Sequence, residues 1–387
     1  MGVKRRVSAT GAGTRKPEVR KVRYAVVGLG YIAQMAVLPA FAHAGENSEL
    51  AALVSDDPEK LAKLGRKYRV ADRFGYGDFE AGLRDAGVDA VYLALPNHLH
   101  REYTERAAAA GVHVLCEKPM AVTEDDCRAM IRACDGSGVK LMIAYRLHFE
   151  EANLRAVDLV QSGRLGDVRA FSSVFTMQVK EGDIRLNPRA QGGGTLYDIG
   201  IYCINAARYL FEAEPVEVAA FAANNGETRF GAPGVDEMTG AVLRFPGERL
   251  ATFTCSFGAA DVARLQVVGT KGSLVMDPAY EYAAALTHRI SIGEKTTQKT
   301  FPRRDQFAPE LVYFSECVMR GEEPEPSGWE GLADVRVIRA LYRAADTGVP
   351  VALEPFDKRD RPDLSQELRK PPVRKPALVN AEEPHPD

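Results

Sequence analysis

A glycine pattern that directly follows a buried apolar run constrains this chain more than any other feature. Residues 24–27 (Tyr-Ala-Val-Val) have the composition of a buried strand, and Gly28-x-Gly30-x-x-Ala33 comes next. The first glycine permits a tight turn, the second lets the backbone approach a pyrophosphate, and a small third residue permits close helix–strand packing. The following helix offers N–H groups to phosphates. The pattern therefore predicts a dinucleotide site rather than a plain glycine turn.

Strand and helix patterns alternate through the first 146 residues. The further expected strands are 50–54, 89–95, 112–115 and 141–144, and the expected helices are 36–43, 58–68, 102–110 and 123–135. Such alternation is typical of a parallel sheet with right-handed crossovers. We therefore predict an α/β fold, a doubly wound Rossmann domain over residues 23–146.

The pattern changes in the second half of the chain. Strand-like runs occur at 168–174, 216–222, 240–245, 250–257 and 263–269, separated by turn residues, and helices are expected at about 195–210 and 332–345. Successive strands without intervening helices favour an antiparallel sheet. We predict an α+β domain for substrate binding and oligomerisation over residues 147–352, with a large, open, mostly antiparallel sheet. An uncovered sheet face would suit a homodimer or homotetramer.

Both ends of the chain have the composition of appendages. Residues 1–22 hold seven Lys/Arg and one Glu, which predicts a basic flexible arm. Residues 353–387 hold seven prolines and many charges of both signs, which predicts a mobile tail, with wrapping around a neighbouring subunit as the alternative.

Composition narrows the class of protein. The chain has 387 residues and a formal net charge of −3, so it presents no overall basic field for nucleic acid. No apolar stretch approaches the roughly 18 residues of a membrane span. Six scattered cysteines without a CxxC pair favour reduced thiols in a cytoplasmic protein.

The end of the second expected strand bears on cofactor choice. Ser55 stands where an acidic residue would accept hydrogen bonds from a ribose 2′-hydroxyl, and Lys60 follows near the next helix. Both residues suit a 2′-phosphate, so we favour NADP(H) over NAD(H). Asp56 and Asp57 leave NAD possible, because either carboxylate could turn toward the ribose. The alternative role of Asp57 is to cap a helix that begins at Pro58.

The strongest chemical signal is a lysine at the end of a strand. Lys118 follows the run 112–115 and precedes Pro119, at the sheet edge where open α/β folds bind ligands. A glycine-rich segment, 192–194, leads into a second helix that carries Asp198 and Tyr202 at spacing i, i+4, so both can reach one ligand. The alternatives without a ligand are that Lys118 is a charge exposed to solvent at a strand end, and that Asp198 and Tyr202 belong to an ordinary helix start.

These motifs resemble those of the Gfo/Idh/MocA oxidoreductases. The resemblance is carried by GLGYIA (28–33), ALPNHLH (94–100), HVLCEKPMA (113–121) and GGGTLYDIGIY (192–202), and is greatest for the glucose-fructose oxidoreductase branch with its NADP-dependent aldose and dihydrodiol dehydrogenases. It implies a Rossmann domain, a sheet domain and assembly as dimers or tetramers. By this resemblance Lys118 touches nicotinamide and substrate, and Arg185 contacts the nucleotide, without the Trp that precedes it in that branch.

The expected activity is hydride transfer between a nicotinamide cofactor and a sugar or polyol. Tyr202 is the preferred acid/base and Lys118 the charge that stabilises its phenolate, with Lys118 as base the competing assignment. Asp198 is expected to orient the sugar hydroxyls or Lys118. The expected cofactor residues are Gly28, Gly30, Tyr31, Ile32, Ser55, Lys60, Pro96, Asn97, His100, Glu117, Lys118, Arg146 and Arg185. The expected substrate residues are Lys118, Arg146, Asp198 and Tyr202.

Two alternatives bound this expectation. His98 and His100 lack a third ligand nearby, so we expect no metal. A nucleotide-binding regulator of the same fold, without catalysis, is the alternative function, although such a protein would be expected to lose the lysine–proline motif.

Overall fold

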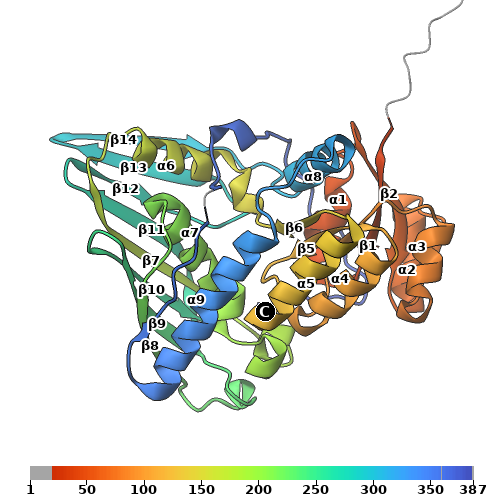
Figure 1. The fold of residues 1–387 in the computed structure, drawn as a ribbon, viewed down its shortest axis with the longest axis horizontal. Coiled ribbons are helices and arrows are strands. Elements are labelled where there is room, and N and C mark those ends of the chain that lie inside the picture. Colours follow the sequence, from red (N-terminus) through yellow and green to blue (C-terminus); the bar gives the residue numbers. More distant parts are fainter. Residues whose placement is uncertain (1–19, 359, 386–387) are drawn as a thin grey trace, which may run out of the picture.

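A computed structural model describes residues 20–358 and 360–385, in which the chain forms two sheets placed side by side (Figure 1). The first sheet has six parallel strands in the order β3-β2-β1-β4-β5-β6. Its strands are β1 Val22–Val27, β2 Ser48–Val54, β3 Asp72–Phe74, β4 Ala90–Leu93, β5 His113–Glu117 and β6 Leu141–Ala144. Its helices are α1 Leu38–Ala40, α2 Pro58–Tyr68, α3 Phe79–Asp85, α4 His100–Ala109 and α5 Glu124–Ser137. This is the Rossmann domain that the alternation predicts.

The glycine turn after β1 depends on the absence of a side chain. Gly28 has φ +89°, and a Cβ there would lie 2.5 Å from the backbone oxygen of Ala94. The helix that follows contains a π-helical turn, Ala33–Val37, directly after its first two residues. Asp57 caps α2, since its carboxylate accepts from the backbone N–H groups of Glu59 and Lys60.

The second sheet has nine strands in the order β14-β13-β12-β11-β7-β10-β9-β8-β15, with one parallel pair, β7 and β10. Its strands are β7 Val168–Gln178, β8 Glu217–Ala223, β9 Met238–Phe245, β10 Arg249–Ser256, β11 Gly258–Gly269, β12 Gly272–Met276, β13 Leu286–Ile292, β14 Lys295–Phe301 and β15 Val351–Ala352. The later helices are α6 Glu151–Gln161, α7 Ile201–Phe211, α8 Ala308–Arg320 and α9 Gly328–Thr347. The large, mostly antiparallel sheet agrees with the sequence prediction.

The two units share helices across the expected boundary at 146/147. Helix α8 packs against β1 and β2 of the first sheet, where the Tyr24 hydroxyl donates to the backbone oxygen of Leu311. Helix α9 packs against both α5 and β8. The chain therefore returns to the first unit after β14 and adds the last strand of the second sheet, β15, only after α9. The contacts of α8 and α9 fix one unit against the other.

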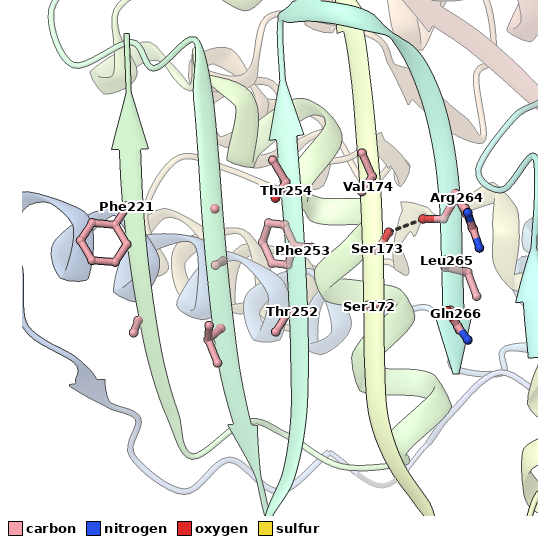
Figure 2. Close-up of a pocket in the computed structure, with 14 residues that line it drawn as sticks. Ser172, Ser173, Val174, Phe221, Thr252, Phe253, Thr254, Arg264, Leu265 and Gln266 are labelled. Carbon is pink, nitrogen blue, oxygen red and sulfur yellow. Dashed lines mark hydrogen bonds between the residues drawn. The ribbon is translucent and has the colours of Figure 1, made fainter. Parts of the chain in front are cut away.

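One face of the second sheet is covered by α7 and α9, and the opposite face is open (Figures 1 and 2). Side chains on the central strands alternate between the two faces, as antiparallel strands with one buried face require. Phe221 on β8 is 80% exposed, and Val174, Val242 and Leu250 are also exposed. This open face therefore carries exposed apolar side chains on β7, β8, β9 and β10, among polar ones such as Thr252 and Gln266.

The carboxyl-terminal segment differs from the expected mobile tail. It follows the surface of the same chain, where Leu368 donates its backbone N–H to Phe149 and Asp305 pairs with Lys370. Backbone hydrogen bonds of this kind need no apolar core, so composition does not reveal them. The basic arm expected at 1–22 lies outside the described residues apart from its last three.

The described ranges contain neither a candidate membrane span nor a candidate metal cluster. Among residues 20–358 and 360–385, no helix is both long enough and apolar enough to cross a bilayer. Within the same ranges no group of three or more His, Cys, Asp or Glu residues is placed to hold a metal ion.

Candidate active site

A cavity of about 320 Å³ lies at the carboxyl ends of the first sheet, between it and the second domain. Its Rossmann side is formed by the loops after β1 and β4 and by the ends of β5 and β6, and β7 contributes to the opposite wall. Of the expected site residues it collects Gly30, Tyr31, Ile32, Pro96, Asn97, Glu117, Lys118, Arg146, Arg185, Asp198 and Tyr202. Ligands of open α/β sheets bind at this edge.

The glycine turn leaves room for a dinucleotide. Gly30 lines the cavity, and a Cβ built on it would meet no atom within 4 Å. That open space fits a pyrophosphate lying against the backbone. Asn97 adds a link between the domains, because its side chain donates to the backbone oxygen of Gly192 at 2.8 Å.

Lys118 crosses from the first domain to the second. Its Nζ donates to the backbone oxygen of Asp198 at 2.8 Å and to Oδ1 of the same residue at 3.2 Å. The ammonium also lies 4.7 Å from the centre of the Tyr202 ring. Burial by itself would lower the pKa of Lys118, but Tyr202 and Asp198 outweigh that effect and raise this pKa above its ordinary value. Lys118 is thus held in its protonated form. This supports a role in stabilising a negative charge more than a role as the base.

Asp198 joins two cations. Its Oδ2 accepts a hydrogen bond of 2.6 Å from Nε of Arg185, in addition to the bond from Lys118. Burial opposes ionisation, but the two cations prevail and lower the pKa of Asp198 well below its ordinary value. Asp198 lies in a π-helical turn, Leu196–Gly200, which precedes α7. Such turns are frequent at functional sites because they displace side chains from regular helical positions.

Tyr202 lies between the two positive groups of the Rossmann domain. The Arg146 guanidinium is 5.0 Å from its ring centre, on a side chain that is almost fully buried and donates to the backbone oxygen of Tyr280. The rings of Phe175 and Tyr280 pack around Tyr202 at 5.6 and 5.9 Å between centroids. These contacts fix the phenol in the cavity with Lys118 and Arg146 beside it.

Four expected cofactor residues do not line the cavity. Gly28 shapes the turn, and Ser55 is buried behind it, where its Oγ accepts from the backbone N–H of Asp57. Lys60 lies in the first turn of α2. The ring nitrogens of His100 lie 2.9 Å from backbone oxygens of Pro119 and Leu95, so His100 positions the loop after β5 instead of meeting a ligand.

Other cavity residues were not found from the sequence. They include Thr176, Asn187, Gln191, Asp261, Glu281, Tyr282, Pro384 and His385. They come from strands β7 and β11, from segments that lie between strands and from the carboxyl-terminal segment, so no local motif unites them. Their polar groups give the cavity many hydrogen-bonding partners for a hydroxylated ligand.

Comparison with known proteins agrees with this geometry. Residues 22–145 match the oxidoreductase family with an NAD-binding Rossmann fold, and residues 153–275 match the GFO/IDH/MocA C-terminal domain. The D-xylose 1-dehydrogenase [NADP(+)] of Haloarcula marismortui is 34% identical over 339 residues, which span 86% of this chain and 93% of that protein.

Solved structures share the fold over a similar range. The aldose-aldose oxidoreductase of Caulobacter crescentus, crystallised with glycerol, has a TM-score of 0.81 and 43% identity over 86% of this chain and 100% of its own. A 3-ketoreductase of Actinomadura kijaniata in complex with NADP has a TM-score of 0.75 and 27% identity over 84% of this chain and 98% of its own. Two domains in the same order, with these identities over most of the chain, establish that the protein belongs to the GFO/IDH/MocA oxidoreductase family.

Proposed function

We propose that this oxidoreductase transfers hydride between NADP and a sugar or polyol of the aldose type. The observation that carries the proposal is the convergence of Lys118, Asp198 and Tyr202 in one cavity beside the open glycine turn. The names of the xylose dehydrogenase and the aldose-aldose oxidoreductase support the substrate class and, with the NADP-bound ketoreductase, the cofactor.

The proposed role of each residue follows from the charge that it carries. Tyr202 accepts the proton of the reacting hydroxyl in the oxidative direction, and returns it to the carbonyl oxygen in the reductive direction. Lys118 stabilises the phenolate, and the anionic Asp198 holds Lys118 and Arg185 in place. The nicotinamide, when bound, accepts or donates the hydride.

The choice of NADP is supported by the residues at the start of α2, where the adenosine ribose is expected. Both carboxylate oxygens of Asp57 are committed, Oδ1 to backbone N–H groups of α2 and Oδ2 to the side chain of Asn380. Asp57 is therefore a helix cap with little capacity left for a ribose hydroxyl. The Ser55 hydroxyl and the Lys60 ammonium remain the groups that suit a 2′-phosphate.

The test is absorbance of reduced nicotinamide during incubation with NADP⁺ and a panel of aldoses, polyols and inositols. We expect turnover with at least one aldose, and loss of turnover with retained NADPH binding in Lys118→Ala. Lys140→Ala is the matched control, because Lys140 lies next to the opposite end of β6 and pairs with Glu323. Full activity in Lys118→Ala would refute both acid–base assignments. NADPH binding without turnover on any substrate would instead favour a regulatory protein.

We also propose an oligomeric state and a cellular compartment for this enzyme. The open face of the second sheet, with Phe221 near its edge, supports a homodimer or homotetramer formed through that face (Figure 2). All six cysteines are free and buried, which supports a reducing compartment such as the cytoplasm.

A further inference from the structure

The last described residues of the chain reach from one domain to the other beside the proposed cofactor groove. We name residues 377–385 the C-terminal strap. It begins at α2, where Lys67 donates to the backbone oxygen of Ala377, and it ends beyond β7, where the backbone N–H of Lys180 donates to Pro384 at 2.9 Å. The strap is therefore tied to both walls of the groove.

The strongest tie involves the turn that would hold the pyrophosphate. Gln34 follows Ala33 in the π-helical turn, and its side chain is 1% exposed. Its Nε2 donates to the backbone oxygen of Val379 at 2.8 Å, and its Oε1 accepts from the backbone N–H of Val379 at 2.8 Å. The amide thus pairs with the strap as a neighbouring strand would, directly beside the glycine turn.

A second tie lies at the start of α2, where the adenosine ribose is expected. Asn380 donates to Oδ2 of Asp57 at 3.0 Å and to Oε2 of Glu59 at 2.9 Å. Asn380 thus holds one oxygen of each of two carboxylates at the expected ribose site. Asn380 also has a positive φ of 46°, a conformation that Asn tolerates better than most residues.

The end of the strap lies at the cavity that contains the proposed catalytic residues. Pro384 and His385 line the same cavity as Lys118 and Tyr202. His385 lies near enough to Glu281 for its charge to oppose the effect of burial, which raises the pKa of that carboxyl. The strap therefore follows the groove from the expected ribose end to the expected nicotinamide end.

We propose that the C-terminal strap is part of the cofactor site, where it holds NADP in the groove and must release Gln34 and Lys180 before the cofactor exchanges. The inference rests on the proposed cofactor site. Four side-chain hydrogen bonds tie the strap to the Rossmann domain through Gln34, Asp57 and Glu59. Detachment of the strap must break these hydrogen bonds, so they slow the exchange of the cofactor. The chemical steps of the reaction are unchanged.

The experiment measures NADPH dissociation by stopped-flow fluorescence, with excess NADP⁺ as the competitor. We compare the full chain, a chain that ends at Pro376, the variant Asn380→Ala, and the control Arg369→Ala. Arg369 lies in the same carboxyl-terminal segment, but it pairs with Glu151 and Glu367, outside the strap. Asn380→Ala keeps the test valid if the shortened chain does not fold, because only exposed contacts are removed.

We expect dissociation to be roughly tenfold faster in the shortened chain, a smaller increase in Asn380→Ala, and no change in Arg369→Ala. Equal dissociation rates in all four proteins would overturn the role of the strap while leaving the proposed function intact. No NADPH binding by the full chain would overturn the cofactor site itself, and the strap proposal with it.

Discussion

Two positively charged side chains, Lys118 and Arg146, contact the ring of Tyr202. Asp198 pairs with Lys118 and shares Arg185 with Asp183, and the Arg146 guanidinium adds a further positive charge over the Tyr202 ring. Positive charges stabilise a nearby anion most strongly where water is excluded, and Lys118 and Arg146 are largely buried. At the scale of single residues, this arrangement of charges supports the acid–base role proposed for Tyr202.

Replacement of Tyr202 by Phe tests that role directly. Phe keeps the ring that Lys118 and Arg146 contact, and removes only the hydroxyl. We expect kcat to fall about a hundredfold or more, the usual contribution of a positioned acid/base, with NADPH affinity unchanged. Steady-state kinetics and NADPH titration give both values. Undiminished turnover would transfer the acid–base role to Lys118.

A buried histidine predicts how the fold responds to acid. His148 is fully buried, its Nε2 lies 2.9 Å from Oδ1 of Asn205, and burial lowers its pKa to about 4. The unfolded chain protonates this residue near pH 6.5, before the folded chain does, so acid favours unfolding in the window between pH 6.5 and 4. Between pH 7 and pH 5 this single residue removes about 2 kcal/mol of stability.

The variant His148→Gln keeps a donor toward Asn205 but does not titrate. We expect its free energy of unfolding to fall less than that of the native chain as the pH decreases from 7 to 5, by about 2 kcal/mol. Urea unfolding at the two pH values provides the comparison. Parallel losses in both proteins would show that His148 does not carry this part of the acid sensitivity.

At the scale of elements, α7 and α9 are held together beneath the site by one buried arginine. Arg208 on α7 is fully buried and donates to Glu214, Glu330 and Asp334, the last two on α9. Asp334 also accepts from the Tyr145 hydroxyl, next to Arg146. The helix that carries Tyr202 is thus fixed by charge as well as by apolar packing.

Removal of that arginine leaves buried carboxylates without their cation. We expect Arg208→Met to lose about 3–5 kcal/mol of unfolding free energy, as for other broken buried ion pairs. The control is Arg343→Met on the exposed side of α9, which should change stability by less than about 0.5 kcal/mol. Urea denaturation measures both. A loss in Arg208→Met no larger than in the control would mean that the network contributes little to stability.

The sequence predicted elements where the evidence is local. The glycine turn, the cap at Asp57 and five of the six strands of the first sheet depend on neighbouring residues, and the structure contains them, whereas the short edge strand β3 was not predicted. Strand β14 was missed because its residues are polar and, apart from Phe301, exposed, so no alternation marks it. The strap was missed for a different reason, since Val379 and its partner Gln34 are 345 positions apart. Periodicity carries no information about a contact of that range.

At the scale of the whole molecule, the two sheets divide their tasks. The first sheet presents the ends of its strands to the cavity, while the second turns one face inward to α7 and α9 and leaves the other open. An open apolar face on a broad sheet costs free energy in water unless it is covered. In the dimer proposed above, a second copy of the chain would cover this face with the same residues, as two-fold symmetry requires.

The last prediction concerns that open face. Phe221 is 80% exposed on β8 and stands clear of the neighbouring strands (Figure 2). A charge at this position would be buried without a partner in a dimer, so we expect Phe221→Asp to shift the protein from an oligomer toward the 42.3 kDa monomer. Met319→Asp on α8 is the matched control, because Met319 is an exposed apolar residue away from this face. Light scattering after size-exclusion chromatography measures the mass of each variant. An unchanged mass in Phe221→Asp, or a native chain that is already monomeric, would show that the open face does not join two copies.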